Sequence, residues 1–145
     1  MNKLIKALWF ATLIATSAFL LFVYAGFTEE QLILITNSST GIDRETFFFG
    51  TLGWIMISNF TFYVLQWRLR KNDSNFSEFT KGWLMGLAAG FNFFLIVCLS
   101  FVQVFNGGEN FNFDSIGYLI FISLGLIVLW TLALPIYLVK EKISA

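Results

Sequence analysis

The 145-residue sequence contains no histidine, only one cysteine and only one proline. Histidine is the ligand that most haem, copper and catalytic zinc sites use, so its absence argues against such centres. Cys98 stands inside an apolar stretch and has no second cysteine with which to form a disulfide or exchange thiols. We therefore expect no metal site and no cofactor.

Charged residues are also few, at 12% of the chain, and their formal net charge is zero. No basic run is long enough to follow a phosphate backbone, so the sequence predicts no nucleic-acid partner. Hydrophobic residues make up 57% of the chain, far above the share in an average soluble domain. This composition predicts a single membrane domain over residues 1–145, whose first partner is the lipid bilayer.

Four apolar runs, at about 7–26, 47–67, 82–105 and 116–139, predict four membrane-spanning helices. Runs of this length suit a hydrocarbon core of about 30 Å at about 1.5 Å per helical residue. The first run could also be a signal peptide, but it exceeds the roughly 7–15 apolar residues of such peptides, so we expect a retained helix. The predicted fold class is all-α, an integral membrane bundle of four antiparallel transmembrane helices.

The distribution of lysine and arginine predicts the orientation of this bundle. One side holds all but one of these residues: Lys3, Lys6, Arg68, Arg70, Lys71, Lys81, Lys140 and Lys142. Arg44 alone falls on the other side. Because such residues stay preferentially in the cytoplasm, both termini are predicted to be cytoplasmic. Aromatic residues fit the same boundary, since Trp9, Trp83 and Tyr137 lie near it as a membrane-interface belt would.

The polar segment 27–46 sets four carboxylates against Arg44, namely Glu29, Glu30, Asp43 and Glu45. Carboxylates can form a catalytic pair or bind a hard cation such as Ca²⁺. Their spacing singles out no site, and solvated acidic charge is ordinary in loops, so we expect neither role.

The short apolar run 32–35 lies within the same segment and cannot span a membrane. It fits either a strand-like segment or one turn of a surface helix. Thr40 and Asp43 are both candidate N-caps for the helix that follows.

Three glycines, Gly82, Gly86 and Gly90, repeat every four residues in the third apolar run. This spacing places them on one helix face, where another helix backbone can approach closely, although glycine is also common in membrane helices generally. We predict a helix-packing face here, with Gly86 in close contact with another helix backbone. The rest of the chain is expected to be organised around this run.

Uncharged polar residues form two further stripes, because the predicted spans have no ionisable residue in their cores. Asn59 and Gln66 share a face of the second helix, and Asn92 and Gln103 lie close to one face of the third. Asn59 and Asn92 have nearly the same depth at 1.5 Å per residue, so we predict a hydrogen bond between them. The contact would stabilise helix packing by about 0.6–2 kcal/mol per bond, or alternatively line a polar path.

The third helix therefore has two occupied faces in this interpretation. Asn92 points about 120° away from the mean direction of the three glycines, at about 100° per residue. We expect neighbouring helices on both faces. The absence of an ionisable residue in the predicted helix cores argues against a proton-coupled exporter or a pump.

The stretches YAGFTEEQL and RETFFFG, followed by Asn59 and Asn92, resemble short uncharacterised four-helix membrane proteins of Bacteroidetes-type bacteria. The resemblance spans most of the chain. It implies a setting in the bacterial inner (plasma) membrane and carries no known activity with it.

The function predicted from these features is non-catalytic. We expect an accessory or interaction subunit of a membrane assembly, which binds other membrane protein subunits or further copies of itself. The alternative is a small transporter or a protein that handles lipids or other hydrophobic ligands, with an uncharged cavity beside Asn59 and Asn92. A membrane enzyme is the third interpretation.

Overall fold

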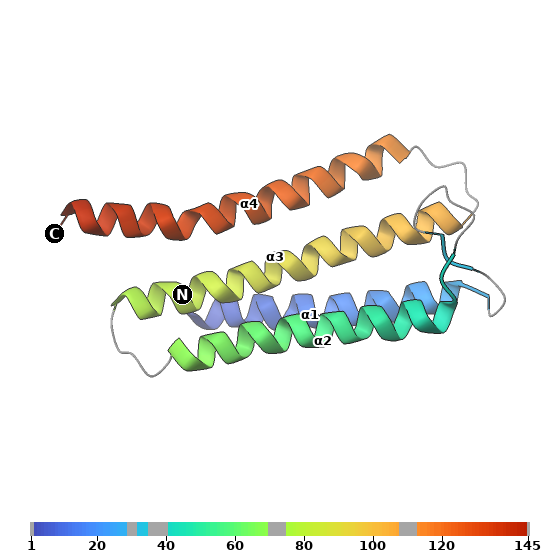
Figure 1. The fold of residues 1–145 in the computed structure, drawn as a ribbon, viewed down its shortest axis with the longest axis horizontal. Coiled ribbons are helices and arrows are strands. Elements are labelled where there is room, and N and C mark those ends of the chain that lie inside the picture. Colours follow the sequence, from blue (N-terminus) through green and yellow to red (C-terminus); the bar gives the residue numbers. More distant parts are fainter. Residues whose placement is uncertain (1, 29–31, 35–40, 70–74, 108–112, 145) are drawn as a thin grey trace.

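The computed structural model describes residues 2–28, 32–34, 41–69, 75–107 and 113–144, which form four long helices (Figure 1). The helices are α1 (Asn2–Gly26), α2 (Arg44–Leu69), α3 (Asn75–Asn106) and α4 (Phe113–Ser144). Successive helices run in opposite directions, and α1 begins at the end of the molecule where α4 finishes (Figure 1). We call this the terminus end and the opposite end the loop end. Each helix is long and apolar enough to cross a membrane, which confirms the all-α prediction with four candidate spans.

The helices are longer than the apolar runs that predict them. α3 begins at Asn75, so most of the polar stretch before residue 82 is helical, and α4 continues through Pro135 to Ser144. Two contacts stabilise the extra turns of α3. Lys81 forms an ion pair with Glu78 at 2.9 Å, and the Phe79 ring stacks on Tyr137 of α4 at 4.0 Å between centroids. Apolar length marks the part of a helix suited to hydrocarbon, whereas the helix itself continues wherever side chains support it.

α3 is the central helix of the molecule. It packs against α1, α2 and α4, and α1 also packs against α2, whereas α4 contacts only α3 among the described residues. About a third (33%) of the apolar span of α3 is buried, compared with 6% of that of α4. The architecture is therefore a three-helix bundle of α1, α2 and α3, with α4 lying along one side of α3 (Figure 1).

The hydrophobic core lies toward the loop end of this three-helix bundle. It consists of six buried side chains: Leu20, Val23, Phe27, Ile33, Ile55 and Leu99. Ile33 belongs to the connection between α1 and α2, and it is fully buried. Its main chain pairs with Ile42 in an isolated antiparallel bridge, with N–H···O distances of 2.8 and 3.0 Å. The run that begins at residue 32 is thus strand-like, and its isoleucine enters the core.

Side chains at the end of α3 and just before α2 satisfy main-chain groups on either side of this bridge. The Asn106 amide accepts from the Leu34 N–H (2.7 Å) and donates to the Leu34 carbonyl (2.9 Å), as a neighbouring strand would. Asp43 caps α2 by accepting from the Thr46 N–H at 3.1 Å, while the other candidate cap, Thr40, lies outside the described residues. The loop end is therefore closed by polar contacts that satisfy the main chain.

Arg44 joins the end of α1 to the start of α2. Its guanidinium donates to the Phe27 carbonyl at 2.8 Å and to the Tyr24 hydroxyl at 3.3 Å, and it lies 4.3 Å from the centroid of the Tyr24 ring. A cation is favourable at a helix C-terminus, where main-chain carbonyls have no helical donor. The lone basic residue of this end thus has a structural role.

Candidate functional site

A buried amide pair joins α2 to α3 near the middle of the three-helix bundle. Asn59 Nδ2 donates to Asn92 Oδ1 at 2.8 Å, and Asn92 Nδ2 donates to Asn59 Oδ1 at 3.0 Å. Both side chains are inaccessible, since Asn92 has no exposed surface and Asn59 retains 4%. The two helices run antiparallel, so residues at matched depth meet directly. The structure thus brings together the two asparagines that share a depth in the sequence.

Three residues of α1 complete this polar network. Trp9 Nε1 donates to Asn59 Oδ1 at 2.8 Å, and Asn92 Nδ2 makes a long contact of 3.5 Å to the Thr12 hydroxyl. The Thr16 hydroxyl lies 3.2 Å from the Asn92 carbonyl and 2.7 Å from that of Thr12. Each of the three helices contributes polar groups, so the network ties α1, α2 and α3 together at one level.

The network leaves neither asparagine with a spare donor for water or a ligand. The second N–H of Asn59 Nδ2 goes to the Ile55 carbonyl of its own helix at 2.9 Å. Asn59 Oδ1 accepts from two helices, and both Nδ2 groups are used twice. Buried amides arranged this way stabilise and specify packing, because every alternative register would leave them unsatisfied.

Gln66 and Gln103, which share the predicted polar stripes, do not belong to the network. Both side chains are half-buried, and neither hydrogen-bonds to a described residue. They lie on either side of the network along the bundle, Gln66 toward the terminus end and Gln103 toward the loop end. The structure therefore brings together one pair of the four predicted amides.

The glycine face of α3 meets α4. A Cβ atom added at Gly86 would lie 2.7 Å from Cε2 of Trp130, and closer still to Cζ2, so the position has no room for a side chain. At Gly90 the nearest atom is Ile127 Cγ1 at 3.8 Å, an ordinary van der Waals distance, and Gly82 is buried. An indole ring, rather than the expected helix backbone, thus fills the space above Gly86. The reason is that α4 presents large side chains on the stripe that faces α3.

Two tryptophans form a reciprocal bond between α3 and α4. Trp83 Nε1 donates to the main-chain carbonyl of Trp130 at 2.7 Å, and Trp130 Nε1 donates to that of Trp83 at 2.9 Å. Each helical carbonyl has a second lone pair that can accept such a donor. Together with the ring stack of Phe79 and Tyr137, these bonds hold α4 near the terminus end.

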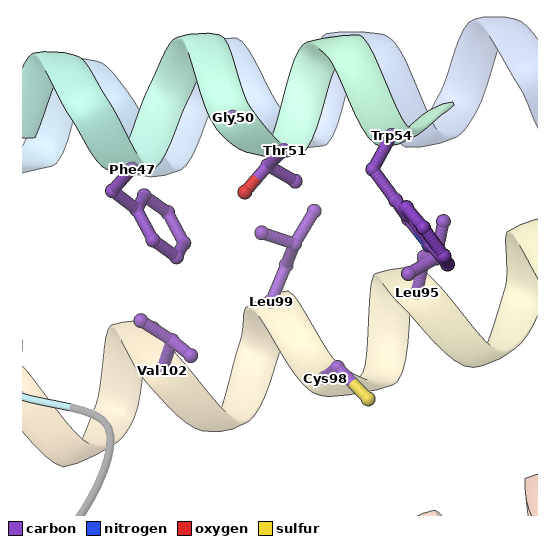
Figure 2. A pocket seen from close by; sticks show the side chains of 8 residues that line it. All are labelled: Phe47, Gly50, Thr51, Trp54, Leu95, Cys98, Leu99 and Val102. Atoms are coloured by element: carbon purple, nitrogen blue, oxygen red, sulfur yellow. The ribbon is translucent and has the colours of Figure 1, made fainter. Parts of the chain in front are cut away.

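An apolar slot lies between α2 and α3 near the loop end, with a volume of about 270 Å³ (Figure 2). We call it the loop-end slot. Figure 2 shows Phe47 and Thr51 of α2 pointing toward α3, with Leu99 of α3 pointing back toward Thr51. Its lining residues are Phe47, Gly50, Thr51, Trp54, Leu95, Cys98, Leu99 and Val102.

A second apolar slot of about 330 Å³ lies between α1, α3 and α4, nearer the terminus end. We call it the terminus-end slot. It exists because α4 and α1 both pack on α3 without meeting each other among the described residues. Its lining residues are Ile5, Leu8, Thr12, Gly86, Ala89, Gly90, Phe93 and Trp130. Neither slot is lined by Asn59 or Asn92.

The carboxylates of the segment 27–46 form no cation site in the part of the chain that the structure describes. Asp43 and Glu45 are exposed, and Asp43 serves as a helix cap. Glu29 and Glu30 lie outside the described residues. Within the described ranges, no three Cys, Asp or Glu side chains gather closely enough to hold a metal ion.

Several residues that shape these contacts are absent from the predicted set. Trp9, Thr12 and Thr16 follow one another at spacings of three and four, which places them on one face of a helix. That spacing is the signal that could have linked them to the asparagines. Trp83 and Trp130 carry no comparable signal, because a tryptophan in a membrane helix has the same local pattern whether it faces lipid or a neighbouring helix.

Comparison of the chain with family models, with curated proteins and with solved structures gives no match.

Proposed function

We propose that this chain is a non-catalytic subunit of an assembly in the bacterial inner (plasma) membrane, which it spans four times with both termini in the cytoplasm. The four apolar helices and the eight-to-one distribution of lysine and arginine support this setting. The terminus end then lies at the cytoplasmic face and the loop end outside. Reporter fusions at Ala145 and within residues 37–40 should report opposite sides of the membrane. Signals from the same side would contradict the topology.

The single observation that carries the subunit proposal is the position of α4. α1, α2 and α3 close a core and a polar network among themselves, whereas α4 contacts only α3 within the described residues. The side of α4 that faces α3 contains Ser123, Ile127, Trp130 and Tyr137. The fold of the first three helices needs little from α4, so α4 is free to serve a partner.

The residues on the far side of α4 recur at regular spacings of three and four. Its exposed members are Phe121, Val128, Leu132, Ile136 and Val139, and half-buried Gly125 lies between them. Nothing lies within 4 Å of a Cβ atom added at Gly125. Large side chains around a small residue form a groove into which another membrane helix can pack. We propose that this face, which we call the far face of α4, binds another membrane protein subunit or a second copy of the chain.

The alternative function, a transporter or a ligand-handling protein, has less support. It requires an uncharged cavity beside Asn59 and Asn92. The two amides donate to each other, to the Ile55 carbonyl of α2 and to Thr12 of α1, and neither slot is lined by Asn59 or Asn92. A solute path would need polar groups that hydrogen-bond to what passes.

Two triple-alanine variants test the subunit proposal in the organism's own membranes. The first replaces Phe121, Leu132 and Ile136 on the far face of α4. The second, a matched control, replaces Met56, Ile57 and Phe60 on the exposed face of α2, where exposure is similar.

Mild-detergent purification followed by native gel analysis should give a stoichiometric complex for the wild type and the α2 variant. The α4 variant should remain folded but lose most of its partner, because truncation of buried interface anchors costs more than about 1 kcal/mol each. A wild type that always runs as a single chain would refute the proposal. So would equal loss of partner from both variants.

A further inference from the structure

The two apolar slots differ in their distance from the membrane surfaces predicted for this chain. The walls of the terminus-end slot run from Ile5 to Thr12 on α1 and from Gly86 to Phe93 on α3. Seven residues of helix correspond to about 10 Å. This length fits within one leaflet, which is half of a hydrocarbon core of about 30 Å. The slot therefore lies within the cytoplasmic leaflet in the proposed orientation.

The polar groups that border the terminus-end slot are already bonded within the protein. The Thr12 hydroxyl donates to the Trp9 carbonyl at 2.8 Å, and Trp130 Nε1 donates to the Trp83 carbonyl. Gly86, Ala89 and Gly90 form a floor of small residues. Water would gain few hydrogen bonds in such a space, whereas a hydrocarbon chain would restore the van der Waals contacts that the walls lack.

Charge distinguishes the mouths of the two slots. Exposed Lys3 and Lys6 belong to the same first turns of α1 as Ile5, at the end of the terminus-end slot that lies toward the predicted cytoplasmic surface. The loop-end slot begins at Phe47, next to exposed Asp43 and Glu45, and the guanidinium of Arg44 there is engaged by Tyr24 and Phe27. An anionic headgroup is therefore favoured at the first mouth and opposed at the second.

We propose that the terminus-end slot binds one acyl chain of an anionic phospholipid from the cytoplasmic leaflet, with the headgroup phosphate at Lys3 and Lys6. The lipid fills the space between α1 and α4 and links the appended helix to the three-helix bundle. This inference rests on the proposed bilayer setting but not on the existence of a protein partner.

Replacing a glycine in the wall of each slot with leucine tests the proposal. Gly90→Leu places a side chain in the terminus-end slot, and Gly50→Leu does the same in the loop-end slot. Neither position is blocked, because a Cβ atom has no neighbour closer than 3.8 Å at Gly90 and none within 4 Å at Gly50. Leu8→Trp, on the exposed α1 wall, fills the terminus-end slot without altering α3.

Native mass spectrometry of the purified protein, with phosphatidylglycerol or phosphatidylcholine added to the detergent, reports the bound lipid. The wild type should retain one phosphatidylglycerol in preference to phosphatidylcholine. Gly90→Leu and Leu8→Trp should each lower its occupancy at least tenfold, whereas Gly50→Leu should stay within twofold of the wild type. The double variant Lys3→Gln, Lys6→Gln should abolish the preference for the anionic lipid.

Three outcomes would overturn the proposal. They are equal loss of lipid from Gly50→Leu and Gly90→Leu, retention of lipid by both terminus-end variants, and a wild type that binds the two lipids equally. Extraction of membranes at alkaline pH tests the bilayer setting separately. If the chain stays in the membrane pellet while both terminus-end variants keep their lipid, only the proposed lipid site is refuted. If the chain is washed off the membrane, the proposed bilayer setting is refuted.

Discussion

α3 meets its neighbours through two chemically different faces. Toward α1 and α2 it presents Asn92, which is fully buried and bonded to both helices. Toward α4 it presents glycines and Trp83, and the partner indole of Trp130 remains 42% exposed. At the level of Asn92 the first face is closed to its surroundings, and the loop-end slot borders it only nearer the loop end. The second face stays partly open at Trp130 itself. This difference indicates that one helix can anchor a self-sufficient core and also carry an appended helix.

The largest effect that tests this comparison is expected from Asn92→Leu. The change removes the amide partner of Asn59 and leaves buried polar groups unsatisfied, at a cost of about 2–4 kcal/mol. Thermal unfolding in detergent measures the loss. The double variant Asn59→Leu, Asn92→Leu should be more stable than the single variant, because replacing both partners removes the unsatisfied groups. A single variant that unfolds like the wild type would show that the closed face does not depend on its amides.

Gly86→Leu should produce the next largest effect, confined to the contact with α4. A leucine side chain must displace the indole of Trp130, and such overpacking costs about 1–3 kcal/mol. Gly90→Ala is the control, since its methyl group would sit at an ordinary distance from Ile127 and should change stability by less than about 0.5 kcal/mol. Thermal unfolding compares the two. Equal effects would mean that the Trp130 contact does not distinguish the glycines.

Trp83→Phe should loosen α4 without loosening the three-helix bundle. It keeps an aromatic ring but removes the donor to the Trp130 carbonyl, which is worth about 0.5–1.5 kcal/mol. Hydrogen exchange should become faster in α4 and remain unchanged in α1 and α2. Trp54→Phe is the matched control, because Trp54 makes no hydrogen bond to the described residues through its indole. Faster exchange throughout the chain would contradict the independence of the two faces.

The smallest effect is expected from Gln66→Leu and Gln103→Leu. These amides are half-buried and have no hydrogen bond to the described part of the chain, so each change should alter stability by less than about 0.5 kcal/mol. Thermal unfolding of these variants, measured side by side with Asn92→Leu, compares the losses of stability directly. A loss as large as that of Asn92→Leu would extend the polar network beyond the five residues that form it.

Part of the candidate site follows from the sequence because it depends on depth alone. Counting residues from the ends of two antiparallel helices places Asn59 and Asn92 at one level, and the structure has them there. The same count says nothing of Trp9 or Thr16, whose bonds depend on how α1 rotates about its axis. The face pattern, by contrast, groups Gln66 and Gln103 with the asparagines, although they lie at other depths along the bundle.

The sequence by itself determined the four apolar helices and their order, because hydropathy and helix length are local properties that need no partner. Only the tertiary structure decided three further features. Among the described residues α4 contacts only α3, an indole fills the space above Gly86, and Ile33 enters the core from a connection. Each of these contacts joins residues distant in the chain. Their geometry depends on the volumes and rotations of helices packed together, which no single stretch of sequence encodes.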